Sequence, residues 1–139
     1  MKRRFSRYHI LAIMQVIIAI GAIPTGISFI RDPSGVSSGL NIGLLDNSPF
    51  IDFYFPGLFL LVFLGFGNIA GAMISGLKIE VSGFLGLILG ILLTGWILLQ
   101  WHWIGLHSFL QPVMLILGIA EAVLGFVLLR QLIRYPEIE

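Results

Sequence analysis

The chain alternates between four long apolar runs and short polar connections. The runs occupy residues 10–30, 53–77, 81–99 and 109–129. Each is close to the ~20 residues with which an α-helix crosses the ~30 Å hydrocarbon core of a membrane. Because four crossings use most of the 139 residues, no soluble domain fits beside them. The pattern predicts an all-α integral membrane four-helix bundle, a single domain over 1–139, with spans at about 9–30, 54–77, 81–101 and 109–132.

Composition agrees with this fold class and narrows the chemistry. Hydrophobic residues make up 58% of the chain and charged residues 11%, whereas a soluble domain carries roughly 25% charged residues. The chain has no cysteine, which excludes disulfides and thiolate metal sites. The formal net charge is +1, so the charge balance does not favour a nucleic-acid partner. We expect no cofactor and no metal, and membrane lipids as the surrounding partner.

The distribution of positive charge predicts the orientation. Seven of the eight Lys and Arg residues lie near the two termini or in the tight connection between the second and third runs. The eighth, Arg31, follows the first run, at the opposite end of the expected helices. The seven are Lys2, Arg3, Arg4, Arg7, Lys78, Arg130 and Arg134, and the residues near Arg31 include Asp32, Asp46 and Asp52. Because membrane proteins keep Lys and Arg on the cytoplasmic side, both termini are expected in the cytoplasm and the connections at 31–52 and 101–108 outside.

The first external connection, 31–53, is long for a compact fold. The segment DPSG at its start predicts a tight turn. Ser48 followed by Pro49 is typical of a helix N-terminus, which predicts a short interfacial helix that ends near Pro56 and Gly57. Four aliphatic residues lie between these signals, Leu40, Ile42, Leu44 and Leu45. We expect a packed lid over the outer mouth of the bundle, and a mobile surface loop is the alternative.

Glu121 is the charged residue inside the last apolar run. Small and polar residues recur every three or four positions in each run, and such faces let helices approach closely in lipid. At ~1.5 Å per residue, Gln15, Asn68 and Glu121 fall at one depth, with Thr94 above them. An ionised carboxylate is costly there, so we expect a neutral Glu121 that donates to an amide oxygen of Asn68 or Gln15. This polar cluster either fixes helix register or anchors a ligand or proton.

A second group of polar and aromatic residues lies near the expected outer surface. Its members, the mouth residues, are Trp101, His102, Gln111 and, from the lid, Asp52. His102 and His107 with an aspartate would be an alternative metal or acid–base site, but a spacing of five does not align two histidines on one helical face. We therefore expect the mouth residues to act as amphipathic side chains at the interface.

Three short segments carry a resemblance to other proteins. DPSG, then SPFIDFYFPG before a glycine-rich helix, then SFLQP at the start of the last helix resemble a group of small bacterial four-helix membrane proteins. The resemblance implies a location in the bacterial plasma (inner) membrane and carries no activity. The four-helix plan is also similar, more distantly, to DoxX-like and EXPERA-type proteins, some of which bind lipophilic ligands or isomerise sterols. That likeness is one of fold.

These observations favour a non-enzymatic protein that binds a lipophilic molecule or a membrane partner in a cavity within the bundle. The polar cluster would form the floor of that cavity, and the mouth residues its entrance. A small homo-oligomeric transporter in which Glu121 exchanges protons is the first alternative. A structural accessory subunit, whose glycine faces dock another membrane protein, is the second alternative. An isomerase-type membrane enzyme is the third.

Overall fold

The structure, a computed structural model, describes residues 6–106 and 109–134, and it is helical with no strand in these ranges. In chain order the long elements are α1 (Arg7–Arg31), a continuous rod of α2 (Tyr54–Phe59), η3 (Leu60–Phe66) and α3 (Gly67–Gly76), then α4 (Ser82–Ile104) and α5 (Leu110–Arg134). The lid, residues 32–53, joins α1 to the rod. By length and composition α1, the rod, α4 and α5 can each cross a membrane. The predicted all-α four-helix bundle is confirmed.

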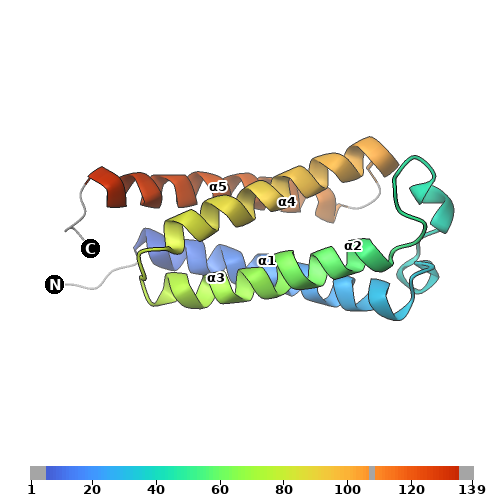
Figure 1. Ribbon diagram of the computed structural model, residues 1–139, viewed down its shortest axis with the longest axis horizontal. Coiled ribbons are helices and arrows are strands. Elements are labelled where there is room, and N and C mark those ends of the chain that lie inside the picture. The colour runs from blue at the N-terminus through green and yellow to red at the C-terminus, as the bar shows by residue number, and fades with distance from the viewer. Residues whose placement is uncertain (1–5, 107–108, 135–139) are drawn as a thin grey trace.

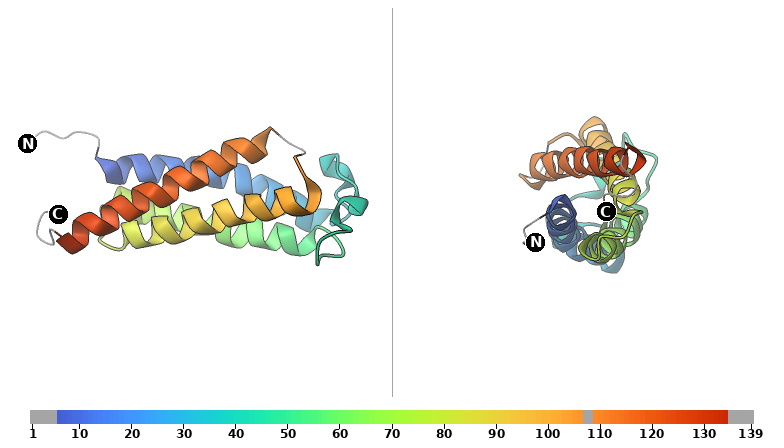
Figure 2. Two further views of the ribbon diagram at one scale, coloured as in Figure 1. Left: turned by 90° about the horizontal axis from the view of Figure 1, so that it is seen from above. Right: turned by 90° about the vertical axis from the view of Figure 1, so that its left-hand side faces the viewer.

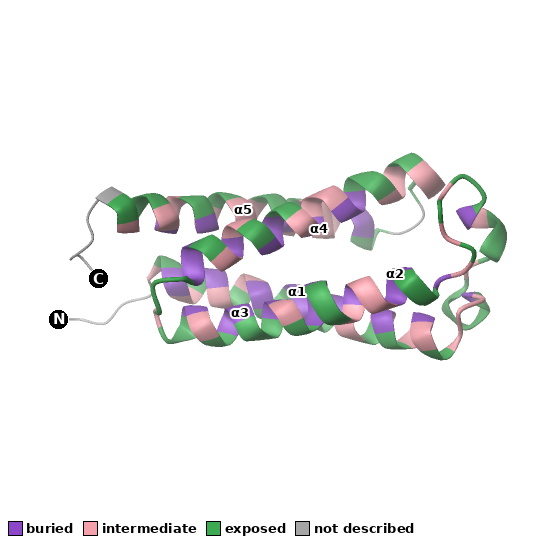
Figure 3. Ribbon diagram, viewed as in Figure 1, coloured by how far each residue is buried: buried purple, intermediate pink, exposed green. Residues whose placement is uncertain are grey.

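The sides of the bundle are apolar where they face outward. Ile20, Phe63, Ile91 and Val123, one from each spanning helix, are 66%, 51%, 57% and 57% exposed. Figure 3 shows buried positions along the inner sides of the helices and exposed positions on their outer sides. A protein in water would place polar side chains at most such positions. The exposed apolar band therefore forms the surface that faces lipid.

Glycines bring the helices together in two close pairs. An added Cβ on Gly90 would meet the backbone of Ala122, so α4 and α5 touch main chain to main chain. In the other pair, a Cβ on Gly26 of α1 would lie 2.8 Å from the carbonyl oxygen of Gly57 in α2. Lipid gives no hydrophobic drive for association between helices, so the dispersion contacts that close approach allows hold each pair together.

The two pairs meet most closely at one end. α1 begins and α5 ends at that same end, the terminal end, and the lid covers the other, the lid end (Figure 1). The α4–α5 pair crosses the α1–rod pair and diverges from it toward the lid end (Figures 1 and 2). This divergence positions the cavity described below.

The rod contains a π-helical turn, η3, which the hydrophobic period did not predict. The Gly67 N–H donates to the carbonyl oxygen of Val62, five residues back rather than four. A wider turn shifts which side chains face inward, and the consecutive residues Leu64 and Gly65 are both buried there. A Cβ on Gly65 would lie 2.6 Å from Cγ1 of Ile23, so the absence of a side chain lets α1 pack against this turn.

The turn between α3 and α4 is closed by the backbone of α3. The Ile79 N–H donates to the carbonyl oxygen of Ile74 at 3.2 Å, and the Lys78 N–H donates to that of Ser75 at 3.0 Å. Lys78 has a φ of 58°, in the left-handed region that ends many helices. The tight connection predicted between the second and third spans is therefore confirmed.

The lid is structured and packed against the bundle, as expected. The Gly35 N–H donates to the carbonyl oxygen of Asp32 at 3.0 Å, which is the predicted tight turn. Two short 3₁₀ helices follow, η1 (Val36–Ser38) and η2 (Ile42–Leu45). Leu45 and Phe53 are 6% and 3% exposed within the main hydrophobic core. The Ser28 and Ser38 hydroxyls lie 2.7 Å apart and join the lid to α1.

The prediction of a helix that begins at Ser48 and Pro49 is wrong. The Ser48 hydroxyl accepts from the Phe50 N–H at 3.2 Å and closes a local turn instead of opening a helix. The rod begins at Tyr54, whose N–H donates to Oδ1 of Asp52 at 3.0 Å. Pro56 thus lies in the first helical turn, where its missing N–H has no intrahelical partner to lose. The helix consequently continues through Pro56 to Gly76.

Candidate functional site

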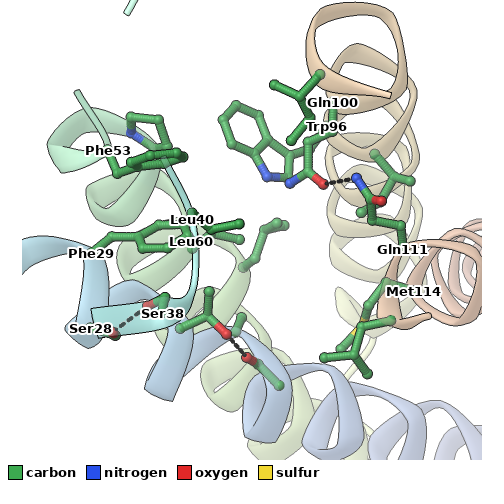
Figure 4. Close-up of a pocket in the computed structure, with 18 of the residues that line it drawn as sticks. Ser28, Phe29, Ser38, Leu40, Phe53, Leu60, Trp96, Gln100, Gln111 and Met114 are labelled. Atoms are coloured by element: carbon green, nitrogen blue, oxygen red, sulfur yellow. Dashed lines mark hydrogen bonds between the residues drawn. The ribbon is translucent and has the colours of Figure 1, made fainter. Parts of the chain in front are cut away.

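A cavity of about 580 Å³ lies between the two helix pairs at the lid end. Sites for small molecules typically measure ~300–1,000 Å³. The base of the cavity consists of Ile18, Leu64 and Leu93, which are 0%, 0% and 2% exposed. Leu40 and Phe53 of the lid line it as well (Figure 4). A mainly aliphatic and aromatic lining therefore joins all four spanning helices to the lid.

The cavity is least covered between α1 and α5 and at the lid residues Ser38 and Gly39, which are exposed. Lining residues on the opposite side, such as Leu60 of η3 and Ile97 of α4, are 8% and 4% exposed. On the α1 and α5 side, by contrast, Pro24 and Leu110 are exposed and Thr25 is half-buried. Because this side belongs to the outward apolar surface of the bundle, the opening leads toward lipid.

The polar groups of the cavity wall are uncharged. None of the described residues that line it is an Asp, Glu, Lys, Arg or His. Gln111 donates through Nε2 to Oε1 of Gln100 at 3.0 Å, and this pair joins α5 to α4 (Figure 4). Thr25 donates to the carbonyl oxygen of Gly21 at 3.0 Å within α1. The cavity thus combines an apolar base with an amide pair on one wall.

Trp96 contributes a polar group of a different kind. Its side chain is 9% exposed and lines the cavity, and its indole Nε1 is buried with no hydrogen-bond partner in the described part of the chain. The ring centroid lies 4.6 Å from that of Phe59 and 6.3 Å from that of Phe50. These aromatic contacts fix the indole in place. Nothing in the sequence pattern distinguished Trp96 from the other tryptophans; its four-residue spacing from Gln100 was the available signal.

The polar cluster lies closer to the terminal end and outside the cavity lining. Gln15 Nε2 donates to Oε2 of Glu121 at 3.2 Å, and the Ser75 hydroxyl donates to Oε1 of Gln15 at 2.9 Å. Gln15, Ser75 and Glu121 are each 0% exposed. The expected contact of Glu121 with an amide is present, but the Gln15 oxygen is occupied by Ser75, so the amide nitrogen faces the acid. Ser75 was not assigned to the cluster from the sequence.

Asn68 does not join this cluster by a hydrogen bond. Its Nδ2 donates to the carbonyl oxygen of Leu64 at 2.8 Å in its own helix, and its Oδ1 has no partner in the described ranges. The hydroxyl oxygen of Thr94 is also buried without one, beside Gly118. The prediction that Gln15, Asn68 and Glu121 form the cavity floor is wrong, because the cavity ends at aliphatic side chains one helical turn nearer the lid.

The mouth residues occupy separate places. Gln111 lines the cavity. Asp52 accepts from the N–H of Tyr54 just before the rod, His102 is exposed, and Trp101 packs against the core from outside the cavity. Within the described ranges no group of three His, Cys, Asp or Glu side chains is placed to hold a metal. His107, named above in the alternative metal site, lies outside the described residues.

Models of known protein families, curated proteins and solved structures were all compared with the chain, and none matches it. The class of protein is therefore defined by the fold and the site: a four-helix chain built as a multi-pass membrane protein, with a cavity that opens sideways under a packed lid. The likeness to small bacterial membrane proteins, and the inner-membrane location it implies, stay predictions.

Proposed function

We propose that the protein binds a lipophilic molecule that enters from the surrounding lipid. The observation that carries this proposal is the apolar cavity of about 580 Å³ with its opening between α1 and α5. A molecule dissolved in the membrane reaches such an opening by lateral diffusion. The lid then separates the bound molecule from the water beyond the lid end.

Selectivity in such a site comes from shape and polar contacts. A ligand that leaves lipid for the cavity exchanges one apolar environment for another, so the hydrophobic effect contributes little to its binding. Rigid walls compensate by giving dispersion contacts that disordered lipid chains do not. Ile18, Leu64 and Leu93 are fixed at the base by the packing of three helices. We therefore propose a binding function that selects among membrane-soluble molecules.

The structure favours neither of the first two alternatives. A proton-coupled transporter would need Glu121 to reach the substrate, and Glu121 is 0% exposed and separated from the cavity by one helical turn of aliphatic side chains. A docking subunit would need free glycine faces; Gly90 and Gly26 are covered by helices of the same chain, and on α4 the open position is Gly95.

Photochemical labelling tests the proposed binding. The probe is a fatty alcohol that carries a diazirine on its chain, added to the protein in lipid nanodiscs. We expect saturable labelling of cavity residues such as Leu60 and Leu93, suppressed by excess unreactive fatty alcohol. Labelling of the lipid-facing residues Phe63 and Val123 should instead increase linearly with probe, because bulk lipid does not saturate.

Two substitutions that fill the cavity provide the matched test. Ala22→Phe and Leu60→Phe each add bulk to a lining residue, and both should remove the saturable labelling while the protein stays folded by circular dichroism. Ile91→Phe adds bulk to a 57% exposed residue on the outer side of α4 and should change nothing. Saturable labelling that persists in both filled variants, or is absent from the native protein, would overturn the proposal.

A further inference from the structure

The cavity wall presents hydrogen-bond donors without acceptors. Trp96 Nε1–H has no partner in the described part of the chain, although buried polar groups are nearly always paired in folded proteins. Indole can only donate. Because Trp96 lines the cavity, an occupant that carries an acceptor can satisfy this donor once the side chains that cover the nitrogen give way.

Gln100 adds a second donor beside the first. Gln111 Nε2 donates both to the carbonyl oxygen of Gly105 at 3.4 Å and to Oε1 of Gln100 at 3.0 Å. The contact with Gly105 fixes which way the Gln111 amide points, and Gln100 must then present its oxygen to Gln111. The NH₂ group of Gln100 is left without a hydrogen bond within the described ranges.

The two donors lie on the same face of one helix. Trp96 and Gln100 are four residues apart on α4, so their side chains are neighbours. Figure 4 shows the indole nitrogen on the side of the ring that faces the hydrogen-bonded amides of Gln100 and Gln111. The indole is held in this position by its contacts with Phe59 and Phe50. The donors are thus positioned before a ligand arrives.

The hydroxyls of the lining are engaged within the protein, although the Ser28–Ser38 pair uses only one of its two O–H groups, and the Trp103 indole also lines the cavity. The Ser28 and Ser38 hydroxyls bond to each other at 2.7 Å, and Thr25 donates to its own helix. The absence of charged side chains among the described lining residues disfavours an anionic or cationic group, since a buried ion needs a partner of opposite charge. The complement of this wall is an uncharged acceptor oxygen.

We propose that the ligand is an uncharged lipid whose polar end carries a carbonyl oxygen, which accepts hydrogen bonds from Trp96 and Gln100 while the apolar remainder fills the base of the cavity. A fatty ester and a quinone share this chemistry. The inference rests on the binding function proposed above and adds to it the class of ligand.

Competition against the saturable photolabelling tests the class of ligand. The competitors are a fatty-acid methyl ester, a quinone with a ten-carbon tail, palmitate and hexadecane. We expect the ester or the quinone to compete at a concentration on the order of tenfold lower than hexadecane or palmitate, and the better of the two identifies the source of the carbonyl. If hexadecane or palmitate competes as well as both carbonyl compounds, the carbonyl assignment is overturned and the binding function stands. If the native protein shows no saturable labelling, both proposals fall.

Substitution of the donor supplies the second arm. Trp96→Phe keeps an aromatic wall and removes the N–H, and it should raise the competing concentration of the carbonyl ligand by about 2- to 10-fold, the effect of one net hydrogen bond, without changing that of hexadecane. Trp101→Phe is the matched control, because Trp101 Nε1 is also buried without a partner in the described ranges but does not line the cavity. Gln100→Leu should act as Trp96→Phe does. Equal carbonyl competition in Trp96→Phe, Gln100→Leu and native protein would contradict the assignment.

Discussion

Glu121 and Gln15 meet in the interior of the bundle, where the carboxyl group has few other polar neighbours. Oε2 of Glu121 accepts from Gln15 at 3.2 Å, and Oε1 has no partner in the described ranges. Hydrogen bonds between membrane helices contribute about 0.6 kcal/mol on average and up to about 2 kcal/mol. A pair of this kind joins α5 to α1 and specifies their register more than it stabilises them.

At the scale of single residues, the prediction concerns the side chain of Glu121. Glu121→Gln keeps an oxygen that accepts from Gln15, so the free energy of unfolding in mixed micelles should change by less than about 0.5 kcal/mol. Glu121→Leu leaves Gln15 Nε2 buried without an acceptor and should lower that free energy by about 1–2 kcal/mol. Saturable photolabelling of the cavity should be the same in Glu121→Gln as in native protein, because Glu121 does not line the cavity. Weaker labelling in Glu121→Gln would show that the acid reaches the ligand after all.

At the scale of the helices, glycines decide which pairs form. Gly90→Ala would push a methyl group into the backbone of Ala122, and backbone gives way less readily than a flexible side chain. We expect a loss of about 1–3 kcal/mol in the free energy of unfolding, the usual cost of overpacking. The matched control is Gly95→Ala on the same helix, where a Cβ meets nothing within 4 Å. There the higher helix propensity of alanine should stabilise the protein by up to about 1 kcal/mol.

The lid carries an acid whose charge organises its first turn. Hydrogen bonds from the Ser34 hydroxyl and from Ser37 lower the pKa of Asp32 from 3.8 to about 2. Because the pKa is lower in the folded lid than in an unfolded chain, the ionised carboxylate stabilises the folded turn above pH 3.8, and this contribution is lost as the pH falls toward about 2.

Hydrogen exchange measures this dependence. The protection factor of the Ser37 amide, which donates to Oδ2 of Asp32 at 2.8 Å, should fall between pH 4 and pH 2, the interval set by the two pKa values. In Asp32→Ala that amide should be weakly protected at every pH, whereas Asp46→Ala, at an exposed lid position, should keep the native profile. A protection factor independent of pH in the native protein would mean that the carboxylate does not hold the turn.

Features that depend on residues close together in the sequence could be predicted from it, whereas features that depend on contacts between distant residues could not. The spans and the Asp32 turn depend on neighbouring residues, so hydropathy and turn chemistry identified them. The inward position of Glu121 followed from helical periodicity. The start of the rod was misplaced because Ser48 and Asp52 are both good capping residues, and only the folded lid determines which of them is used.

The cavity was predicted at the wrong depth along the bundle, because helical periodicity does not determine where a cavity forms. A helix face shows which residues point inward, but not how far the two helix pairs diverge. Asn68 lies on the inward face and bonds to its own helix at Leu64, while Trp96 lies on a comparable face and lines an open space. Their difference comes from the divergence of the two helix pairs, and that divergence is a property of tertiary packing.

Considered as one molecule, the bundle is polar inside at one end and hollow at the other. Near the terminal end Gln15, Ser75 and Glu121 tie three helices together. Near the lid end the α4–α5 pair separates from the α1–rod pair around an apolar space that the lid covers. The molecule therefore combines a tightly packed polar end with an apolar cavity at the other end.

The two ends also differ in charge, and this difference gives the prediction that concerns the whole molecule. Lys78, Arg7 and Arg130 lie at the terminal end, and Arg31 lies at the lid end beside Asp32. Because basic residues are retained in the cytoplasm, this asymmetry predicts that the lid lies outside the cell. The native chain has no cysteine, so a single introduced thiol reports its own side. Asn47→Cys in the lid should react with a membrane-impermeant thiol reagent in intact cells, and Glu80→Cys should react only after permeabilisation. Both positions are exposed, so access to the thiol depends on the membrane rather than on burial in the protein. The reverse labelling would place the cavity opening in the cytoplasmic leaflet.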